Sequence, residues 1–232
     1  MEKIKTHIRY FRRGEIILWS ASALVIVISF LIFDRQNYLT LAASLVGVTS
    51  LIYNARGNPF GQLLMVAFSL MYGVISWNCR YYGEMITYLG MTMPMAVFAL
   101  VSWIRNPYNG NRSEVKVNRI ARREVFFACL LTLAVTAAFY FILKAFNTAN
   151  LFFSTLSVTT SFLAVYLTFR RSAFFAVAYA ANDVVLIVLW ILAARTDRSC
   201  LSVMACFAAF LANDIYGYIS WQRMAKRQAA GV

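Results

Sequence analysis

The sequence predicts an all-α integral membrane protein with eight transmembrane helices. Of its 232 residues, 61% are hydrophobic and only 13% are charged, and the mean hydropathy is +0.65. Soluble domains carry roughly 25% charged and 45–50% apolar residues. Apolar runs of about 20 residues, enough to cross a bilayer, recur along the chain. The composition leaves no room for a separate soluble domain beside the helices.

The runs follow one another with short connections. We expect membrane spans at Glu15–Phe33, Leu39–Asn54, Phe60–Asn78, Tyr82–Ile104, Glu124–Phe146, Leu151–Phe169, Ala173–Ala194 and Cys200–Trp221. The first run is longer than the apolar core of a signal peptide, which is about 7–15 residues, and its small residues Ser20–Ala23 lie at its start. We therefore interpret it as a retained helix.

The basic residues predict the topology. Seventeen of the 22 lysines and arginines fall on one side of these spans, together with both termini. This positive-inside bias places both termini in the cytoplasm. The net charge of +13 thus reflects topology and not a nucleic-acid surface, so no nucleic-acid partner is expected. The single histidine, His7, lies in the N-terminal tail, which excludes histidine-based catalysis and histidine metal sites within the membrane.

An internal repeat relates the two halves of the chain. An offset of 113 residues aligns Tyr53 with Tyr166 and Trp77 with Trp190, and a slip of five more aligns Trp103 with Trp221. One span separates the two triplets, so both enter the membrane in the same direction. Such parallel repeats are typical of transporters that bind substrate between the halves at mid-membrane.

The repeat divides the chain into a 1+3+1+3 arrangement. The segments are an N-terminal tail and extra helix (1–36), a first three-helix bundle (37–105), a basic loop and linking helix (106–148), a second three-helix bundle (149–222) and a cytoplasmic tail (223–232). The same alignment, with its slip of five before the last span, pairs the second-half polar residues with Ser69, Leu70 and Met95, which predicts an apolar first-half wall facing a polar second-half wall.

Two Asn-Asp pairs are the sharpest candidates for function. Asn182–Asp183 and Asn213–Asp214 fall in the middle of two consecutive spans, and each Asp precedes a Trp by seven residues. An intramembrane carboxylate costs several kcal/mol unless it faces a partner or a cavity, so it is a functional candidate by default. Because neighbouring spans run in opposite directions, the two Asp can meet. The alternative is polar contact between helices or subunits.

Other residues complete a candidate substrate site. Aromatic faces hold cationic rings, and the candidates are Tyr53, Tyr72, Tyr179, Tyr216 and Trp190, with Thr160 and Ser69 as mid-span hydroxyls. Aromatic packing, and an interfacial belt for Trp77, Trp103, Trp190 and Trp221, are the alternatives. No Lys or Arg lies mid-membrane, which favours an uncharged or cationic substrate over a nucleotide.

The sequence also lacks the features of an enzyme. It contains no Walker A loop, serine nucleophile elbow or clustered metal ligands, so neither catalysis nor a cofactor is expected. The four cysteines form no CxxC pair and are interpreted as packing residues. Pro94 is expected to kink the fourth span. Segment 106–123 is expected to form a turn and then a basic surface helix against lipid headgroups.

Several ordered blocks resemble one family. The stretches NTANLFFSTLSVTTSFLAVYLTFRRS, AYAANDVVLIVLW and CFAAFLANDIYGYISWQRM closely resemble the PnuC family of bacterial vitamin B3 transporters, and YYGEMITYLGMTMPMAVFALVSWIRNP is similar to the same family. Asn213, Tyr216, Gly217 and Trp221 match a family pattern in the last helix. The first half departs from that pattern, because Pro94–Met95 stands where Asn is expected.

The resemblance implies a specific function. It implies a fold related to the SWEET sugar transporters, a homotrimer in the bacterial inner membrane, and facilitated diffusion of nicotinamide riboside, which a cytoplasmic kinase then traps by phosphorylation. Transport of thiamine, riboflavin or a deoxynucleoside by the same architecture stays open, as does proton coupling through Asp183 or Asp214. A membrane enzyme is the alternative from another class.

Overall fold

The computed structural model describes residues 10–231. His7 and the basic residues Lys3, Lys5 and Arg9, which entered the topology prediction, lie outside the described residues. Eight helices in this part of the chain are long and apolar enough to cross a membrane, which confirms the predicted fold class of a multi-pass, all-α membrane protein.

The helices follow the predicted spans closely. They are α2 (Arg13–Phe33), α3 (Tyr38–Ala55), α4 (Phe60–Asn78), α5 (Tyr82–Thr87), η1 (Tyr88–Thr92), α6 (Met93–Arg105), α7 (Arg122–Ala145), α8 (Leu151–Phe169), α9 (Phe175–Ala193) and α10 (Cys200–Ala229). The fourth span consists of α5, η1 and α6 together. The last helix is longer than predicted, because α10 continues past Trp221 to Ala229.

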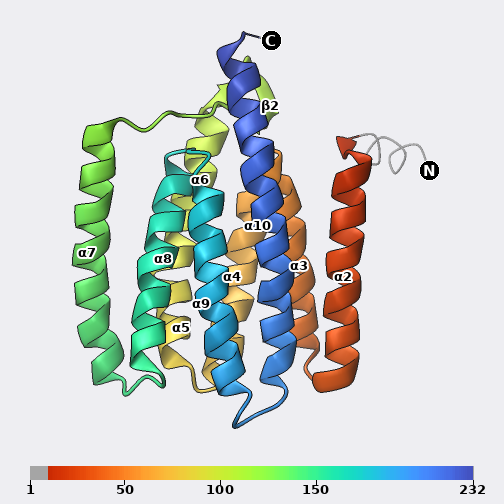
Figure 1. Cartoon of the computed structure of the whole chain (residues 1–232), viewed down its shortest axis with the longest axis vertical. Coiled ribbons are helices and arrows are strands. Elements are labelled where there is room, and N and C mark those ends of the chain that lie inside the picture. The colour runs from red at the N-terminus through yellow and green to blue at the C-terminus, as the bar shows by residue number, and fades with distance from the viewer. Residues whose placement is uncertain (1–9, 232) are drawn as a thin grey trace.

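The helices run side by side (Figure 1), and their contacts group six of the spans into two sets of three, which we call the two bundles. The first contains α3, α4 and the α5–α6 span, and the second contains α8, α9 and α10. The bundles meet where α3 packs against α10 and where α6 packs against α8. Helix α7 stands at one edge against α8, and α2 packs against α10 and α3 at the other edge.

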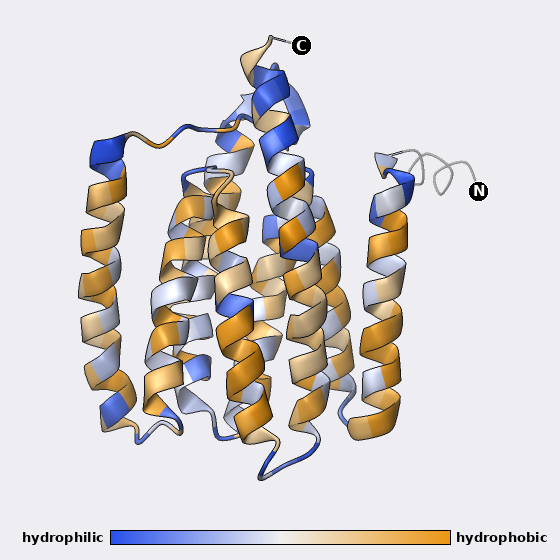
Figure 2. Ribbon diagram, in the orientation of Figure 1, coloured by the Kyte–Doolittle hydropathy of each residue, from blue (hydrophilic) through white to orange (hydrophobic). Residues whose placement is uncertain are grey.

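The start of α2 and the end of α10 lie on the same side of the bundle (Figure 1). We call this the terminal side and the opposite one the far side. The helix bodies are predominantly apolar, whereas the terminal side is strongly hydrophilic (Figure 2). Its basic residues include Arg12, Arg56, Arg171, Arg223 and Arg227.

The loop after α6 differs from the prediction. Instead of a basic surface helix, the chain forms an antiparallel hairpin of β1 (Pro107–Tyr108) and β2 (Asn111–Val115) and reaches α7 without a further helix. The turn contains Asn109 and Gly110, both with positive φ, as type I′ hairpin turns require.

Long-range hydrogen bonds explain why this segment is extended. The backbone N–H of Val115 donates to Gly57 O, that of Lys116 to Asn106 O, and that of Asn118 to Arg171 O. The N–H of Val117 donates to the Gln228 side chain of α10. These partners replace the i−4 carbonyls of a helix, and burial of Val115 anchors the strand. The predicted basic surface helix is therefore wrong.

The fourth span is irregular next to Pro94. A π-helical turn, η1, lies directly before α6, and Pro94 occupies the first turn of α6. Proline has no N–H for the carbonyl one turn earlier, so the irregularity lies where the regular ladder cannot continue. Single π-turns are frequent at functional sites, and η1 carries Tyr88 and Met91 into the interior of the protein.

The structure corrects the register of the repeat. The exposed large apolar residues of α4 include Leu63, Leu70 and Trp77, and those of α9 include Val177, Val184 and Ile191. An offset of 114 rather than 113 matches these three pairs, although Val74 is exposed and its counterpart Val188 is only half-buried. Leu70 is 47% exposed and Asp183 only 2%, so they are not counterparts. The counterpart of Asp183 is Ser69, which is fully buried, so the first-half wall is not wholly apolar as predicted.

Candidate functional site

The two halves enclose a buried polar cluster halfway along α9 and α10. The carboxyl groups of Asp183 and Asp214 are 2% and 4% exposed and lie close enough to interact directly. Two consecutive spans thus bring together the two Asp residues that the sequence singled out.

Asn182 is held from the neighbouring helix α8. Its Oδ1 accepts hydrogen bonds from Thr160 Oγ1 at 2.8 Å and from Ser161 Oγ at 2.9 Å. The two hydroxyls fix the carboxamide in one orientation beside Asp183. Ser161 was not among the predicted site residues, because nothing in the sequence shows which hydroxyls of α8 face α9.

Some buried polar atoms of this region have no partner. Among residues 10–231, Ser69 Oγ and Asp183 Oδ2 lie at equivalent positions of the two halves, and neither has a hydrogen-bond partner in the protein. An unpaired buried polar group costs about 1–3 kcal/mol. Such atoms are suited to bind a polar ligand that enters between the halves.

An aromatic cluster from both bundles adjoins these polar groups toward the far side. Tyr72 on α4 is its centre, with ring centroids 4.2 Å from Tyr88, 5.4 Å from Phe207 and 5.9 Å from Trp190. The Trp190 indole N–H donates to the Tyr72 hydroxyl at 2.7 Å and so joins α9 to α4. Tyr88 interacts electrostatically with Asp183, which places the aromatic and polar groups side by side.

Glu84 is a buried acidic residue that the predicted site did not include. It lies in α5, is 0% exposed, and accepts a hydrogen bond from Ser157 of α8 at 3.3 Å through Oε2. Its Oε1 has no partner among the described residues. The packing of α5 against α8 accounts for its burial.

Three predicted site residues lie elsewhere. Asn213 donates to Ser22 of α2 at 2.8 Å, and Tyr216 donates to Glu15 of α2 at 2.9 Å. Tyr53 packs at the terminal side against Phe11, with ring centroids 5.2 Å apart. These contacts attach α2 and the residues before it to the bundles, while Asn213 Oδ1 is buried without a partner among the described residues. Tyr179, in contrast, interacts electrostatically with both Asp214 and Asp183.

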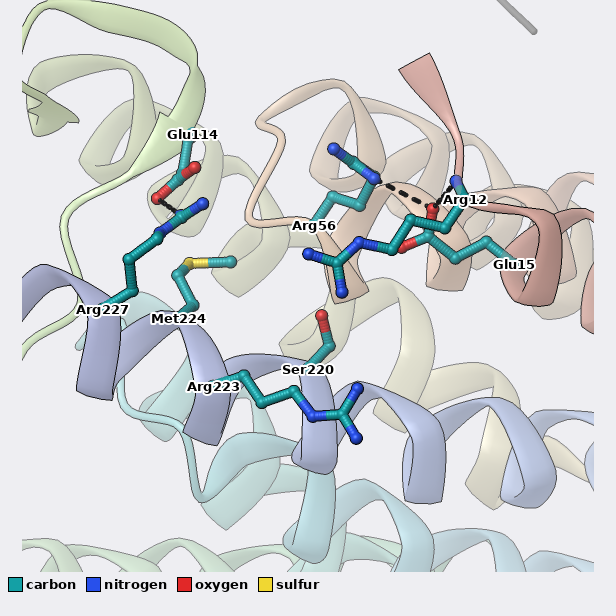
Figure 3. A pocket seen from close by; sticks show the side chains of 8 residues that line it. All are labelled: Arg12, Glu15, Arg56, Glu114, Ser220, Arg223, Met224 and Arg227. Carbon is teal, nitrogen blue, oxygen red and sulfur yellow. Dashed lines mark hydrogen bonds and ion pairs between the residues drawn. The ribbon is translucent and has the colours of Figure 1, made fainter. Parts of the chain in front are cut away.

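The terminal side is closed around Glu15. This carboxylate is 2% exposed and accepts from Arg56 at 2.9 Å, from Tyr216 and from the Arg12 backbone N–H at 2.7 Å. Glu15 lines a cavity of about 190 Å³ together with Arg223 and the ion pair of Arg227 with Glu114 (Figure 3). The arginines thus gather at this mouth and not at the central cluster.

Three of the four span-end tryptophans are buried, so an interfacial belt is the wrong interpretation for them. Trp103, Trp190 and Trp221 are 0% exposed, and only Trp77, at 56%, faces outward. The Trp103 indole donates to the Thr168 carbonyl at 2.9 Å, and the Trp221 indole donates to the Asn54 carbonyl at 2.7 Å. Each bond joins one bundle to the other.

Two related helical bundles with a buried polar and aromatic cluster between them define a membrane transporter of the repeat-containing class. Residues 37–223 match the family model described as nicotinamide mononucleotide transporter, and the chain belongs to this family. It is a family of transporters and not of enzymes.

Two characterised relatives are named nicotinamide riboside transporter PnuC. The one from Neisseria mucosa is 21% identical over 85% of this chain and 77% of the relative, and the one from Haemophilus influenzae is 20% identical over 91% of each. A solved structure described as the vitamin B3 transporter PnuC superposes with a TM-score of 0.82 at 19% identity, over 94% of both chains. That likeness supports the fold.

Proposed function

We propose that the protein carries nicotinamide riboside across the membrane by facilitated diffusion. The observation that carries this proposal is the central cluster, where aromatic rings of both bundles adjoin Asn182 and the carboxyl pair. A pyridinium ring is a cation that aromatic faces attract. The ribose hydroxyls and the carboxamide can pair with the amide, hydroxyl and carboxyl groups.

The riboside suits the cluster better than its 5′-phosphate. A phosphate needs arginine, lysine or a helix N-terminus to offset its charge. Among residues 10–231, the lysines and arginines lie at the two ends of the bundle and none belongs to the cluster. Asp183 and Asp214 would repel an anion there. The family name refers to the mononucleotide, so this preference is a distinct and testable part of the proposal.

Transport would alternate between the two sides of the bundle. The terminal side is closed by Glu15 and by Trp103 and Trp221, whose indoles join the two bundles. The far side is closed by the Trp190–Tyr72 contact. The central cluster is buried between these two closures. Rocking of the bundles about their α3–α10 and α6–α8 contacts would open one side at a time.

We further propose that the terminal side faces the cytoplasm of a bacterial inner membrane, since basic residues concentrate there. A cytoplasmic kinase would trap the riboside as its phosphate. The resemblance also supports a homotrimer, and α7 exposes large apolar residues such as Phe126, Phe127 and Phe141 to lipid or to another subunit. Light scattering of the detergent-solubilised protein would measure the subunit number.

Calorimetric titration tests the substrate and the site together. The purified protein is titrated with nicotinamide riboside, its 5′-phosphate, nicotinamide, thiamine and riboflavin. We expect the riboside to bind, and Asp183→Asn and Asn182→Ala to weaken binding about tenfold or more, or at least 1.4 kcal/mol. Val184→Ala, a change of the lipid-facing neighbour, is the matched control. Tighter binding of the phosphate or of thiamine would overturn the proposed substrate.

Proton-coupled uptake is the second candidate, favoured by the proximity of the two buried carboxyl groups of Asp183 and Asp214. Proteoliposome uptake with and without a proton gradient separates the two mechanisms. A passive carrier equilibrates the riboside at equal concentrations inside and outside. Accumulation above the outside concentration, abolished by Asp214→Asn, would establish coupling.

A further inference from the structure

Two of the four cysteines come together on the far side. Cys79 follows the end of α4 in the first bundle, and Cys200 begins α10 in the second, 121 residues later. Their sulfur atoms are 3.9 Å apart. The other two are separate, because Cys129 is exposed on α7 and Cys206 is buried within α10. The sequence interpretation of all four as packing residues could not foresee this contact.

The two thiols differ in chemical role. Cys79 is partly exposed, whereas Cys200 is buried. The Cys200 S–H donates to Cys79 Sγ, and this hydrogen bond lowers the pKa of the Cys79 thiol below its usual range, although burial and the carboxylates of Asp197 and Asp34 oppose the shift. The thiolate is the reactive form. The partly exposed thiol of Cys79 is therefore the nucleophile, and the buried thiol of Cys200 lies behind it.

We propose that Cys79 and Cys200 form a redox-active dithiol site that closes to a disulfide by exchange with a disulfide-bearing oxidant at the far side. The Cys79 thiolate attacks one sulfur of the oxidant, and the oxidant's other sulfur leaves as a thiolate. Cys200 then loses its proton to solvent and attacks Cys79 Sγ, which releases the second oxidant thiolate. The protein dithiol is oxidised, and the oxidant is reduced to two thiols.

The geometry and the compartment both favour this reaction. A disulfide needs sulfur atoms about 2.05 Å apart, so the pair, whose sulfur atoms lie 3.9 Å apart at the ends of two helices, must close by about 2 Å. If the far side faces the periplasm, as the proposed function has it, the surroundings are oxidising.

Closure of the disulfide would act on transport. The bond joins the end of α4 to the start of α10, on the same side as the Trp190–Tyr72 contact. This step rests on the proposed function, because it requires the bundles to separate at the far side for substrate to enter. The oxidised protein is then held closed to the outside, and the reduced protein is free to cycle.

Thiol counting tests the site. The purified full-length protein is treated with oxidised glutathione, denatured and alkylated, and its mass is measured. Four alkylated cysteines are expected in the reduced protein and two after oxidation, with one peptide pair containing Cys79 and Cys200. Cys129→Ser must still form the bond, and neither Cys79→Ser nor Cys200→Ser forms it. Four free thiols after oxidation, or a different pairing, would overturn the proposal.

Uptake into proteoliposomes tests the consequence. Riboside uptake by the oxidised wild type is expected to fall to the level of empty liposomes and to return with dithiothreitol, while Cys79→Ser stays insensitive to the oxidant. Unchanged uptake by a protein whose disulfide has formed would overturn the gating role. If the reduced protein takes up no riboside, the proposed transport function is wrong. The dithiol site is then still tested by the thiol count, which does not depend on transport.

Discussion

Trp103 and Trp221 lie against each other, with ring centroids 5.4 Å apart, where the two bundles meet on the terminal side. Their indole N–H groups donate in opposite directions, that of Trp103 to Thr168 of α8 and that of Trp221 to Asn54 of α3. Thr168 and Asn54 are equivalent at the corrected offset of 114. The two hydrogen bonds are thus one contact repeated about the pseudo-two-fold axis that relates the bundles.

Trp103→Phe and Trp221→Phe should destabilise the protein by similar amounts. Each change removes the side-chain donor of a buried carbonyl that keeps a backbone donor, the Arg171 N–H for Thr168 O and the Gly57 N–H for Asn54 O. The loss of one such hydrogen bond costs about 0.5–1.5 kcal/mol. For a chain of this size, that lowers the melting temperature by about 2–4 °C for each kcal/mol. Thermal unfolding in detergent measures the loss. Trp77→Phe, at an exposed span end, is the control. Destabilisation by only one of the two buried changes would contradict the symmetric role.

The sequence was sufficient for the eight spans and for the repeat, because hydropathy and length determine a helix that crosses a bilayer. It failed for the hairpin after α6, whose backbone donors find partners in Gly57, Arg171 and Gln228. Those partners are far away in the chain. The predicted register of the repeat was wrong by one residue. It paired Trp77 with Trp190, but Trp77 is exposed and Trp190 is buried, so they do not lie on equivalent helix faces.

Tyr72→Phe and Trp190→Phe should be non-additive in riboside binding. Both remove the same 2.7 Å hydrogen bond between the halves, so the double variant should lose little more than either single one. Calorimetric titration of the four proteins gives the coupling energy, which we expect at about 0.5–3 kcal/mol for residues in contact. Fully additive losses would show that the bond does not support the site.

Glu15→Ala should be more damaging than Glu15→Gln. Removal of this carboxylate leaves Arg56 without its ion pair and leaves Tyr216 without an acceptor. Breaking a buried pair on one side costs about 3–5 kcal/mol, and the 26% exposure of Arg56 reduces this value because water solvates the freed guanidinium. Gln keeps an acceptor oxygen. Thermal unfolding ranks the variants, and equal melting temperatures for the two would contradict the prediction.

The candidate site was predictable only in part. Two acidic residues in the middle of apolar runs can be recognised from the sequence. Because neighbouring spans are antiparallel, Asp183 and Asp214 come together. Glu84 stayed hidden because it lies near a span end. The Asn213 amide nitrogen donates to Ser22 of the first helix, a contact that the sequence does not indicate, and its Oδ1 is buried without a partner among the described residues. Side-chain direction depends on helix packing, and the sequence does not give that packing.

The reactivity of Cys79 should depend on pH in a way that reveals its neighbour. The thiol of Cys200 stabilises the Cys79 thiolate and lowers the pKa of Cys79. The pH of half-maximal maleimide labelling should therefore lie below the usual thiol pKa of about 8.5. Cys200→Ala removes the donor but leaves burial, Asp34 and Asp197, all of which raise the pKa. The midpoint should therefore move upward, and labelling at neutral pH should slow. Labelling rates are measured in a Cys129→Ser background, so that the exposed cysteine does not contribute. An unchanged midpoint in Cys200→Ala would mean that the sulfur contact does not activate Cys79.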